Sequence, residues 1–332
     1  MEPAMPQGMS RREFAFALSS LLIGSLTSWS NTLAAQFPGS GPLRLVAGTS
    51  PGSVADLLAR AIGEQLSSNL RVPVIVENKA GASGVLAAQG VLAAPPDGMT
   101  ILVLSNALVI NPFVMPVQFD PVRDFSGVAH LGSMPHLLVV PSTSPYHSVA
   151  ELVAGAKAKS LTFASAGVGS ASHFAAEKFA MAARIDGVHV PFKNAVDAVT
   201  ATVTGQTDWL VAAPVGAVTE WIRTQRLAAL AVTAPTRFPT LPDVPTLAQA
   251  GISGADSTIW IGLFVSSRTP REIIARLNSA TLAALQSKVA QTQLLNLGAE
   301  SQPLTPEEFD AMILREYESA RDVAKAAKIS VK

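Results

Sequence analysis

The feature that most constrains the fold is a strand, a loop of small residues and a helix that follow one another twice in the chain. The first unit is LRLVAGTSPGSVADLLAR, residues 43–60, where apolar residues recur at helical spacing after the loop. The second is LTFASAGVGSASHFAAEKFAMAA, residues 161–183, with the same order of segments. Strands separated by helices predict parallel βαβ units, and the restart of the pattern predicts two α/β lobes.

Other segments fit the same alternation. Further strands are predicted at 72–77, 99–105 and 136–141, and in GVHVPF, DWLVAAP and LAALAVTAP. The tail, from about Pro270 to Ala327, is predicted to be mostly helical, with Thr305 as an N-cap. We expect one lobe to comprise 36–135 and 260–332 and the other 136–259, each a mostly parallel sheet flanked by helices. A ligand cleft is expected between the lobes, at the carboxyl ends of the strands.

The N-terminus reads as an export signal. Arg11 and Arg12 form a twin-arginine pair, an apolar run too short to span a bilayer follows, and small residues near Ala35 offer a cleavage site. The alternative is a short amphipathic surface helix. We expect residues 1–35 to be a twin-arginine-type signal peptide, so that the mature chain lies in the periplasm without membrane insertion.

Composition excludes several classes of protein. The 332 residues carry no cysteine, which rules out disulfides and a cysteine nucleophile. The formal net charge is zero, so nothing favours nucleic acid as a partner. The sequence contains no metal-binding motif, no G-x-G-x-x-G fingerprint and no P-loop, and we therefore expect no metal and no cofactor.

The stretch from Gly48 to Gly52 matches G-x-S-x-G, the nucleophile elbow of serine hydrolases. In that elbow the residue after the nucleophile supplies a backbone N–H to the oxyanion hole. Here that residue is Pro51, which has no N–H. Loss of one such donor slows catalysis by about 10²–10³. We expect no catalytic residue, and an exported esterase or amidase using Ser50 remains the alternative.

The two loops are better suited to holding an anion passively. Gly52, Ser53, Val54 and Ala55 are expected to present N–H groups at a helix start, where the helix dipole also favours negative charge. Asp56 either serves only as a helix-start acid or orders the site. In the second loop, Ser170 or Ser172 is a candidate N-cap. His173 either packs in the lobe or contacts the ligand.

Several stretches, taken in order, resemble the Bug-type periplasmic solute-binding proteins, the extracytoplasmic receptors of tripartite tricarboxylate transporters. They include SPGSVADLLAR, VIVENKAGASG, PPDGMTIL, FASAGVGSASHFAAE, LAALAVTAPTRFPTLPDVPTLAQAG and LGAESQPLTPEEF. The resemblance covers essentially the whole mature chain. It implies a two-lobed periplasmic-binding-protein-like fold of type II character that closes on a small carboxylate.

The resemblance also implies which residues bind the ligand. They are Pro51, Gly52, Ser53, Val54 and Asp56 in the first loop, Ser105 and Asn106 after the strand at 99–105, Ser165, Gly167, Gly169, Ser170 and His173 in the second loop, and Phe192 and Lys193. The implied partners are membrane permease subunits or a sensor protein, and the receptor is expected to be a monomer.

The chain departs from the family pattern in three stretches. Ser53 replaces a glycine, Phe192 and Asn194 replace a tyrosine and a glycine, and DWLVAAP at 208–214 is apolar where a polar segment is common. A hydroxyl and a carboxyl that could meet a polar ligand are therefore missing. We expect a less polar acid, such as an aromatic or short aliphatic monocarboxylate, rather than a tricarboxylate.

Overall fold

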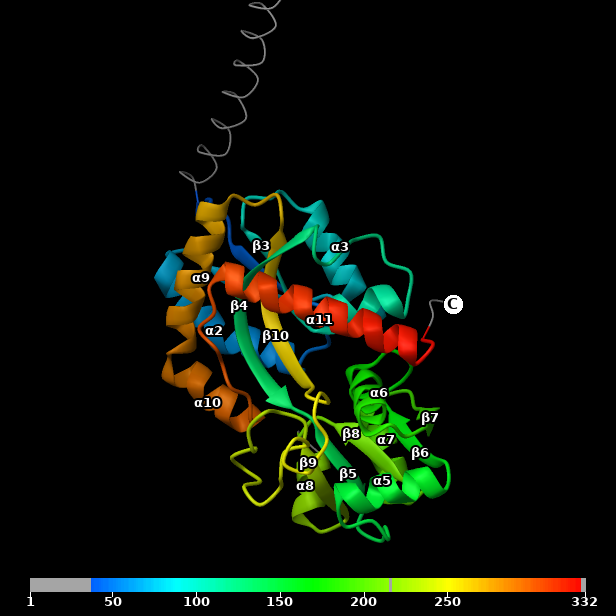
Figure 1. Ribbon diagram of the computed structural model, residues 1–332. Helices are drawn as coiled ribbons and strands as arrows, with labels where there is room; N and C mark the ends of the chain where they lie inside the picture. The colour runs from blue at the N-terminus through cyan, green and yellow to red at the C-terminus, as the bar shows by residue number, and fades with distance from the viewer. Residues whose placement is uncertain (1–36, 215–216, 330–332) are drawn as a thin grey trace, which may run out of the picture.

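The computed structural model describes residues 37–214 and 217–329 (Figure 1). The expected signal peptide at 1–35 lies outside these residues. None of the helices in the described ranges has both the length and the apolar character needed to cross a bilayer.

Strands and helices alternate along most of the chain. The strands are β1 (Leu43–Ala47), β2 (Val74–Asn78), β3 (Thr100–Ser105), β4 (Phe125–Pro135), β5 (Leu137–Pro141), β6 (Leu161–Ser165), β7 (Gly187–Pro191), β8 (Trp209–Ala212), β9 (Leu227–Val232) and β10 (Thr258–Ser266). The α-helices are α2 (Val54–Leu70), α3 (Val85–Ala93), α4 (Ala107–Ile110), α5 (Val149–Ala158), α6 (Ala171–Ala183), α7 (Ala195–Val203), α8 (Ala217–Arg223), α9 (Arg271–Leu285), α10 (Lys288–Leu297) and α11 (Pro306–Ala326). Two 3₁₀ turns, η1 (Ala82–Gly84) and η2 (Asn111–Phe113), complete the elements.

The strands form two five-stranded sheets of the same design. The first has the order β2-β1-β3-β10-β4 and the second β7-β6-β8-β5-β9. Three strands in each are parallel, and the fourth, β10 or β5, is antiparallel to both its neighbours. In each sheet the antiparallel strand is the one that the chain enters from the other sheet. The expected two α/β lobes are therefore present, but each sheet is mixed, with two parallel and two antiparallel pairings.

The lobes are joined by two crossing segments that lie side by side. In the first, β4 runs into β5 with only His136 between them. In the second, the chain returns from β9 to β10, and Thr233 beside β9 binds His136 through its main chain and its hydroxyl. Thr258 of β10 pairs with Pro135 of β4. We call these two crossing segments the hinge.

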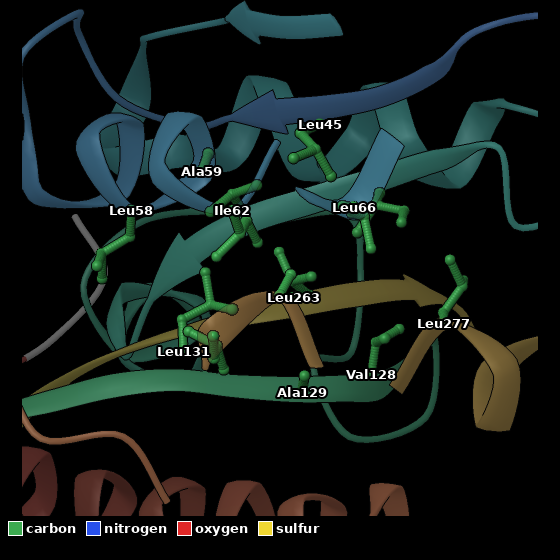
Figure 2. Close-up of a cluster of buried hydrophobic side chains, with 14 of the residues drawn as sticks. Leu45, Leu58, Ala59, Ile62, Leu66, Val128, Ala129, Leu131, Leu263 and Leu277 are labelled. Carbon is green, nitrogen blue, oxygen red and sulfur yellow. The ribbon is translucent and has the colours of Figure 1, made fainter. Parts of the chain in front are cut away.

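Apolar side chains fill the space between the first sheet and its helices. Figure 2 shows Leu58, Ile62 and Leu66 on one face of α2, packed towards Leu131 of β4 and Leu263 of β10. Each of these five side chains is fully buried. The i, i+4, i+8 spacing of the α2 residues explains why this helix lies flat on the sheet.

The lobes also touch away from the hinge. Helix α11 lies across β4 and β10 and runs towards α6 of the second lobe (Figure 1). Phe174 of α6 is buried in a cluster that otherwise belongs to the first lobe and includes Leu108 and Phe309. Gly169 approaches Val114 so closely that an added Cβ would lie 2.5 Å from it.

Candidate functional site

A network of hydrogen bonds around Asp56 holds the loop before α2 in place. Ser53 is the N-cap, and its hydroxyl accepts from the Asp56 N–H. The Asp56 carboxylate, only 2% exposed, accepts from the Gly52 N–H at 2.9 Å, from Arg60 Nε at 3.0 Å and from Asn78 Nδ2 at 2.9 Å. Gly52 has φ +79°, a conformation that glycine adopts without strain.

These contacts define the role of Asp56. Burial alone would raise the pKa of Asp56. The hydrogen bonds from Arg60, Gly52 and Asn78 together outweigh this effect, so the pKa of Asp56 is below its ordinary value. Both carboxylate oxygens are occupied within the loop. Asp56 therefore orders the loop, which was one of its two expected roles.

The loop leaves fewer free donors than the sequence led us to expect. The Gly52 N–H donates to Asp56, and the Ser53 N–H donates to the Ser50 main-chain oxygen. Within the described part of the chain, the N–H groups of Val54 and Ala55 have no partner. An anion at this helix start would bind these two groups, with the helix dipole adding to the attraction.

The start of α6 repeats the arrangement. Ser170 is the N-cap and accepts from the His173 N–H, while the Gly169 N–H donates to His173 Nδ1 at 3.1 Å. Among the described residues, the N–H groups of Ala171 and Ser172 have no partner. His173 is buried and packs at 3.8 Å on the ring of His189. Its Nδ1 is occupied by the loop, so His173 serves to position the loop.

The remaining residues of the second loop are also bound to one another. Ser165 is fully buried, and its hydroxyl donates to the Gly167 main-chain oxygen at 3.0 Å. The same hydroxyl accepts from the Gly167 N–H and contacts His189 Nε2 at 2.6 Å. Burial, together with repulsion from His173, lowers the pKa of His189 to about 4.

A third helix start, which sequence reasoning missed, lies beside this loop. Asn194 caps α7 by accepting from the Asp197 N–H. A pocket of about 330 Å³ lies between the starts of α6 and α7, and its floor and walls come from β8 and from both crossing segments. We call it the hinge pocket. Its lining includes Ser170, Ala171, Ser172, Ala195, Val196, Leu210, Ile259 and His136.

The structure brings some of the expected site residues together and leaves others apart. Ser170 lines the hinge pocket, whereas Phe192 and Lys193 line a separate hollow with Thr200 and Gln206. Ser105 accepts from the Ala107 N–H and so supports the turn after β3.

Asn106, expected beside Ser105, is buried at the hinge. Its amide Nδ2 donates to the Thr258 main-chain oxygen, and its Oδ1 has no partner among the described residues. Pro51 is exposed in the first loop and, as a proline, has no N–H to offer a ligand.

Nothing in the described residues assembles a hydrolase around Ser50. Ser50 is exposed, and within 37–214 and 217–329 no histidine is hydrogen-bonded to its hydroxyl. No group of three or more His, Asp or Glu side chains in these ranges could hold a metal ion. What the geometry offers instead is a set of helix starts with free N–H groups, suited to binding an anion without reacting with it.

Comparison with known proteins identifies the family of the chain. Residues 58–329 match the model of the tripartite tricarboxylate transporter family receptors. A protein of Pseudomonas sp., encoded between tcbD and tcbE, is 35% identical over 275 residues, which cover 82% of this chain and 81% of that protein.

Two solved structures are similar throughout. MatC from Rhodopseudomonas palustris, with bound malate, has a TM-score of 0.71 and 32% identity, and the match covers 87% of this chain and all of MatC. An R. palustris protein solved with adipate has a TM-score of 0.75 and 28% identity, and the match covers 89% of this chain and all of that one. The chain therefore belongs to the tripartite tricarboxylate transporter family of solute-binding receptors.

Proposed function

We propose that this protein is a periplasmic receptor that captures a small carboxylate and passes it to membrane permease subunits or reports it to a sensor protein. Export by a twin-arginine-type signal, cleaved near Ala35, is part of the proposal. The observation that carries it is the pair of capped helix starts at α6 and α7, which flank the hinge pocket, together with the similarly capped start of α2 in the other lobe.

Capture requires differential contact with the two lobes. The starts of α6 and α7 belong to the lobe expected at 136–259, and the start of α2 belongs to the other lobe. A ligand that contacts both helix starts stabilises the closed arrangement over the open one by the free energy of those added contacts. Rotation would occur at the crossing segments around His136 and Thr258.

Two neighbours support a carboxylate as the ligand. MatC was solved with malate and the other R. palustris protein with adipate, and both acids are small. For this chain we propose a less polar acid, because the wall of the hinge pocket is formed mainly by Ala, Val, Leu and Ile side chains. Burying a second carboxylate against such a wall would carry a large desolvation cost.

A thermal-shift screen of the mature protein tests the proposal. The panel contains mono-, di- and tricarboxylates and the neutral amide of each. A ligand at a hundredfold excess over its Kd stabilises by about 2.7 kcal/mol, which raises Tm by a few degrees. We expect a shift with one class of acid and none with its amide. Absence of a shift with every acid, after the protein has been unfolded and refolded to remove any bound ligand, would contradict it.

The Ser50→Ala variant separates this function from ester or amide hydrolysis. A receptor keeps its ligand-induced thermal shift in this variant, because Ser50 is exposed and, among the described residues, only its main-chain oxygen takes part in a hydrogen bond within the loop. A hydrolase would show turnover of aryl esters in the parent protein and lose it in the variant.

N-terminal sequencing of the exported protein checks the signal: retention of Met1 would contradict that part of the proposal.

A further inference from the structure

The hinge pocket contains one polar side chain that the loops do not use. His136 lies between β4 and β5, is 1% exposed and lines the pocket. Its Nδ1 lies 3.4 Å from the main-chain oxygen of Ser257 and 3.4 Å from the Ser257 hydroxyl. Its Nε2 has no hydrogen-bond partner among the described residues.

The other polar side chains of the pocket are already engaged. The Ser170 hydroxyl accepts from the His173 N–H, and the Ser172 hydroxyl accepts from the Ala166 N–H. The two hydroxyls also contact each other at 3.0 Å. Of the buried side-chain atoms left unpaired in the described ranges, His136 Nε2 is the one whose residue lines this pocket.

The imidazole of His136 is neutral at neutral pH. Burial lowers its pKa to about 4, outweighing the opposing effect of the Ser257 main-chain oxygen. A neutral imidazole has one N–H and one acceptor nitrogen. Nε2 is an acceptor if Nδ1 donates to the Ser257 oxygen, and a donor if Nδ1 accepts from the Ser257 hydroxyl.

A buried polar atom of this kind needs a partner that the ligand can bring. A hydroxyl fits either form of His136, since it can donate to Nε2 or accept from an Nε2–H. A second carboxylate fits poorly, because one neutral imidazole cannot replace the several hydrogen bonds that a carboxylate loses on burial. A ligand with a wholly apolar end would leave Nε2 unpaired.

We propose that His136 determines specificity by binding a hydroxyl at the end of the ligand opposite its carboxylate. The ligand is then a small hydroxylated monocarboxylate: the carboxylate faces the free N–H groups at the helix starts, the apolar body lies against Leu210 and Ile259, and the hydroxyl reaches the hinge. A volume of about 330 Å³ admits one six-membered ring or a chain of similar size. This inference rests on the proposed function, because it assumes that the hinge pocket holds the bound acid.

Calorimetric titration of the unmodified mature protein with matched acids tests the inference. The aromatic probes are benzoates that carry hydroxyl, methyl or carboxylate at position 3 or 4. The aliphatic probes are 6-hydroxyhexanoate, heptanoate and adipate. Hydroxyl and methyl have nearly the same size, so their comparison isolates the hydrogen bond. We expect a hydroxylated acid to bind at least about tenfold more tightly than its methyl counterpart and its dicarboxylate.

The His136→Phe variant assigns that preference to one residue. We expect the variant to bind the hydroxyl and methyl acids within about threefold of each other, mainly through weaker binding of the hydroxylated one. His147→Phe is the matched control, because His147 is exposed and its side chain contacts neither lobe's loop. The control should keep the full preference. If His136→Phe does not fold, the hydroxyl and methyl comparison in the parent protein still tests the inference.

The outcomes separate this inference from the proposed function. Equal binding of hydroxyl and methyl acids, or tightest binding of a dicarboxylate, would overturn the role of His136 while leaving a carboxylate receptor. A hydroxyl preference that survives in His136→Phe would overturn it as well. Failure of every acid in this panel and in the wider screen would overturn the proposed function itself.

Discussion

The loops before α2 and α6 share one backbone conformation and hold it with different chemistry. Gly52 and Gly169 have φ values of +79° and +78°, and the N-caps Ser53 and Ser170 have ψ values of 162° and 158°. In both loops the side chain of the third helical residue accepts a hydrogen bond from the glycine N–H. That residue is Asp56 in one lobe and His173 in the other.

The next turn of each helix places a charged residue beside this acceptor, a cation in the first lobe and an anion in the second. Arg60, four residues after Asp56, donates to its carboxylate, and Glu177, four residues after His173, lies 3.4 Å from His173 Nε2. The comparison shows that the backbone conformation is the shared feature and that a carboxylate or an imidazole nitrogen can support it. It also makes the two loops respond differently to mutation and to acid.

The largest expected effect is in the first loop. Asp56→Ala leaves the Gly52 N–H without its acceptor and removes one of the two acceptors of Asn78 Nδ2 and of Arg60. We expect a loss of about 3 kcal/mol in the free energy of unfolding, measured by urea titration.

Asp197→Ala is the matched control for this change. Asp197 occupies the same position in α7 and binds its N-cap Asn194, but it is exposed. We expect it to cost no more than about 1 kcal/mol. Equal losses in the two variants would mean that burial of Asp56 contributes nothing.

Exchanging the acceptor tests the equivalence of the loops directly. In His173→Asp the carboxylate can accept the Gly169 N–H but lies beside Glu177, and we expect a loss of about 2 kcal/mol. The double variant His173→Asp, Glu177→Arg reproduces the pair of the first lobe. It should recover more than half of that loss, measured by a double-mutant cycle in urea. Simple additivity would refute the equivalence.

Acid should open the second loop before the first. The pKa of His189 is lowered to about 4, so an open loop binds more protons than a closed one below the ordinary pKa of about 6.5. Stability of this loop therefore falls as pH decreases from 6.5 to 4, by at most about 1.4 kcal/mol per pH unit for one proton. The pKa of Asp56 is below 3.8, so its contribution is lost only at lower pH.

Hydrogen exchange reports the two loops separately. Protection factors, corrected for the intrinsic pH dependence of exchange, should fall for the Gly169 amide between pH 6.5 and 4. They should stay constant for the Gly52 amide over the same range. Parallel behaviour of the two amides would contradict the role of His189 in the acid sensitivity of the second loop.

The smallest expected effect is the loss of an N-cap, which should be equal in the two loops. Ser53→Ala and Ser170→Ala each remove an N-cap and should each cost about 1 kcal/mol of unfolding free energy, measured in urea. A difference above about 1 kcal/mol would show that the hydroxyl contacts to Thr49 or Ser172 matter more than the cap itself.

Local signals in the sequence were enough to find both loops. Apolar runs followed by glycine and a serine N-cap predicted β1, β6 and the helices after them, because strand, turn and cap chemistry depend on neighbouring residues. The same reasoning predicted a mostly helical tail, which the structure divides into α9, α10 and α11. The DWLVAAP segment was too long as a strand, since β8 covers Trp209–Ala212.

Contacts between distant segments were less predictable. The long strands β4 and β10 pair in antiparallel fashion although more than a hundred residues separate them in the sequence. No alternating apolar pattern predicted these strands. Asn78 and His189 come from strands remote from the loops that they support. His136 was one histidine among five, without a motif. At α7, however, the spacing of Asn194 and Asp197 fits a helix start and could have indicated it.

The central claim is that main-chain N–H groups at the helix starts hold a carboxylate. Its most direct test is calorimetric titration of the refolded mature protein with the tightest-binding acid of the screen and with the amide of that acid. The two ligands have the same shape and differ in charge. The account predicts that the amide binds at least about a hundredfold more weakly, since it carries no charge and turns an N–H₂ group towards the N–H donors. Equal affinity for the acid and its amide would contradict it.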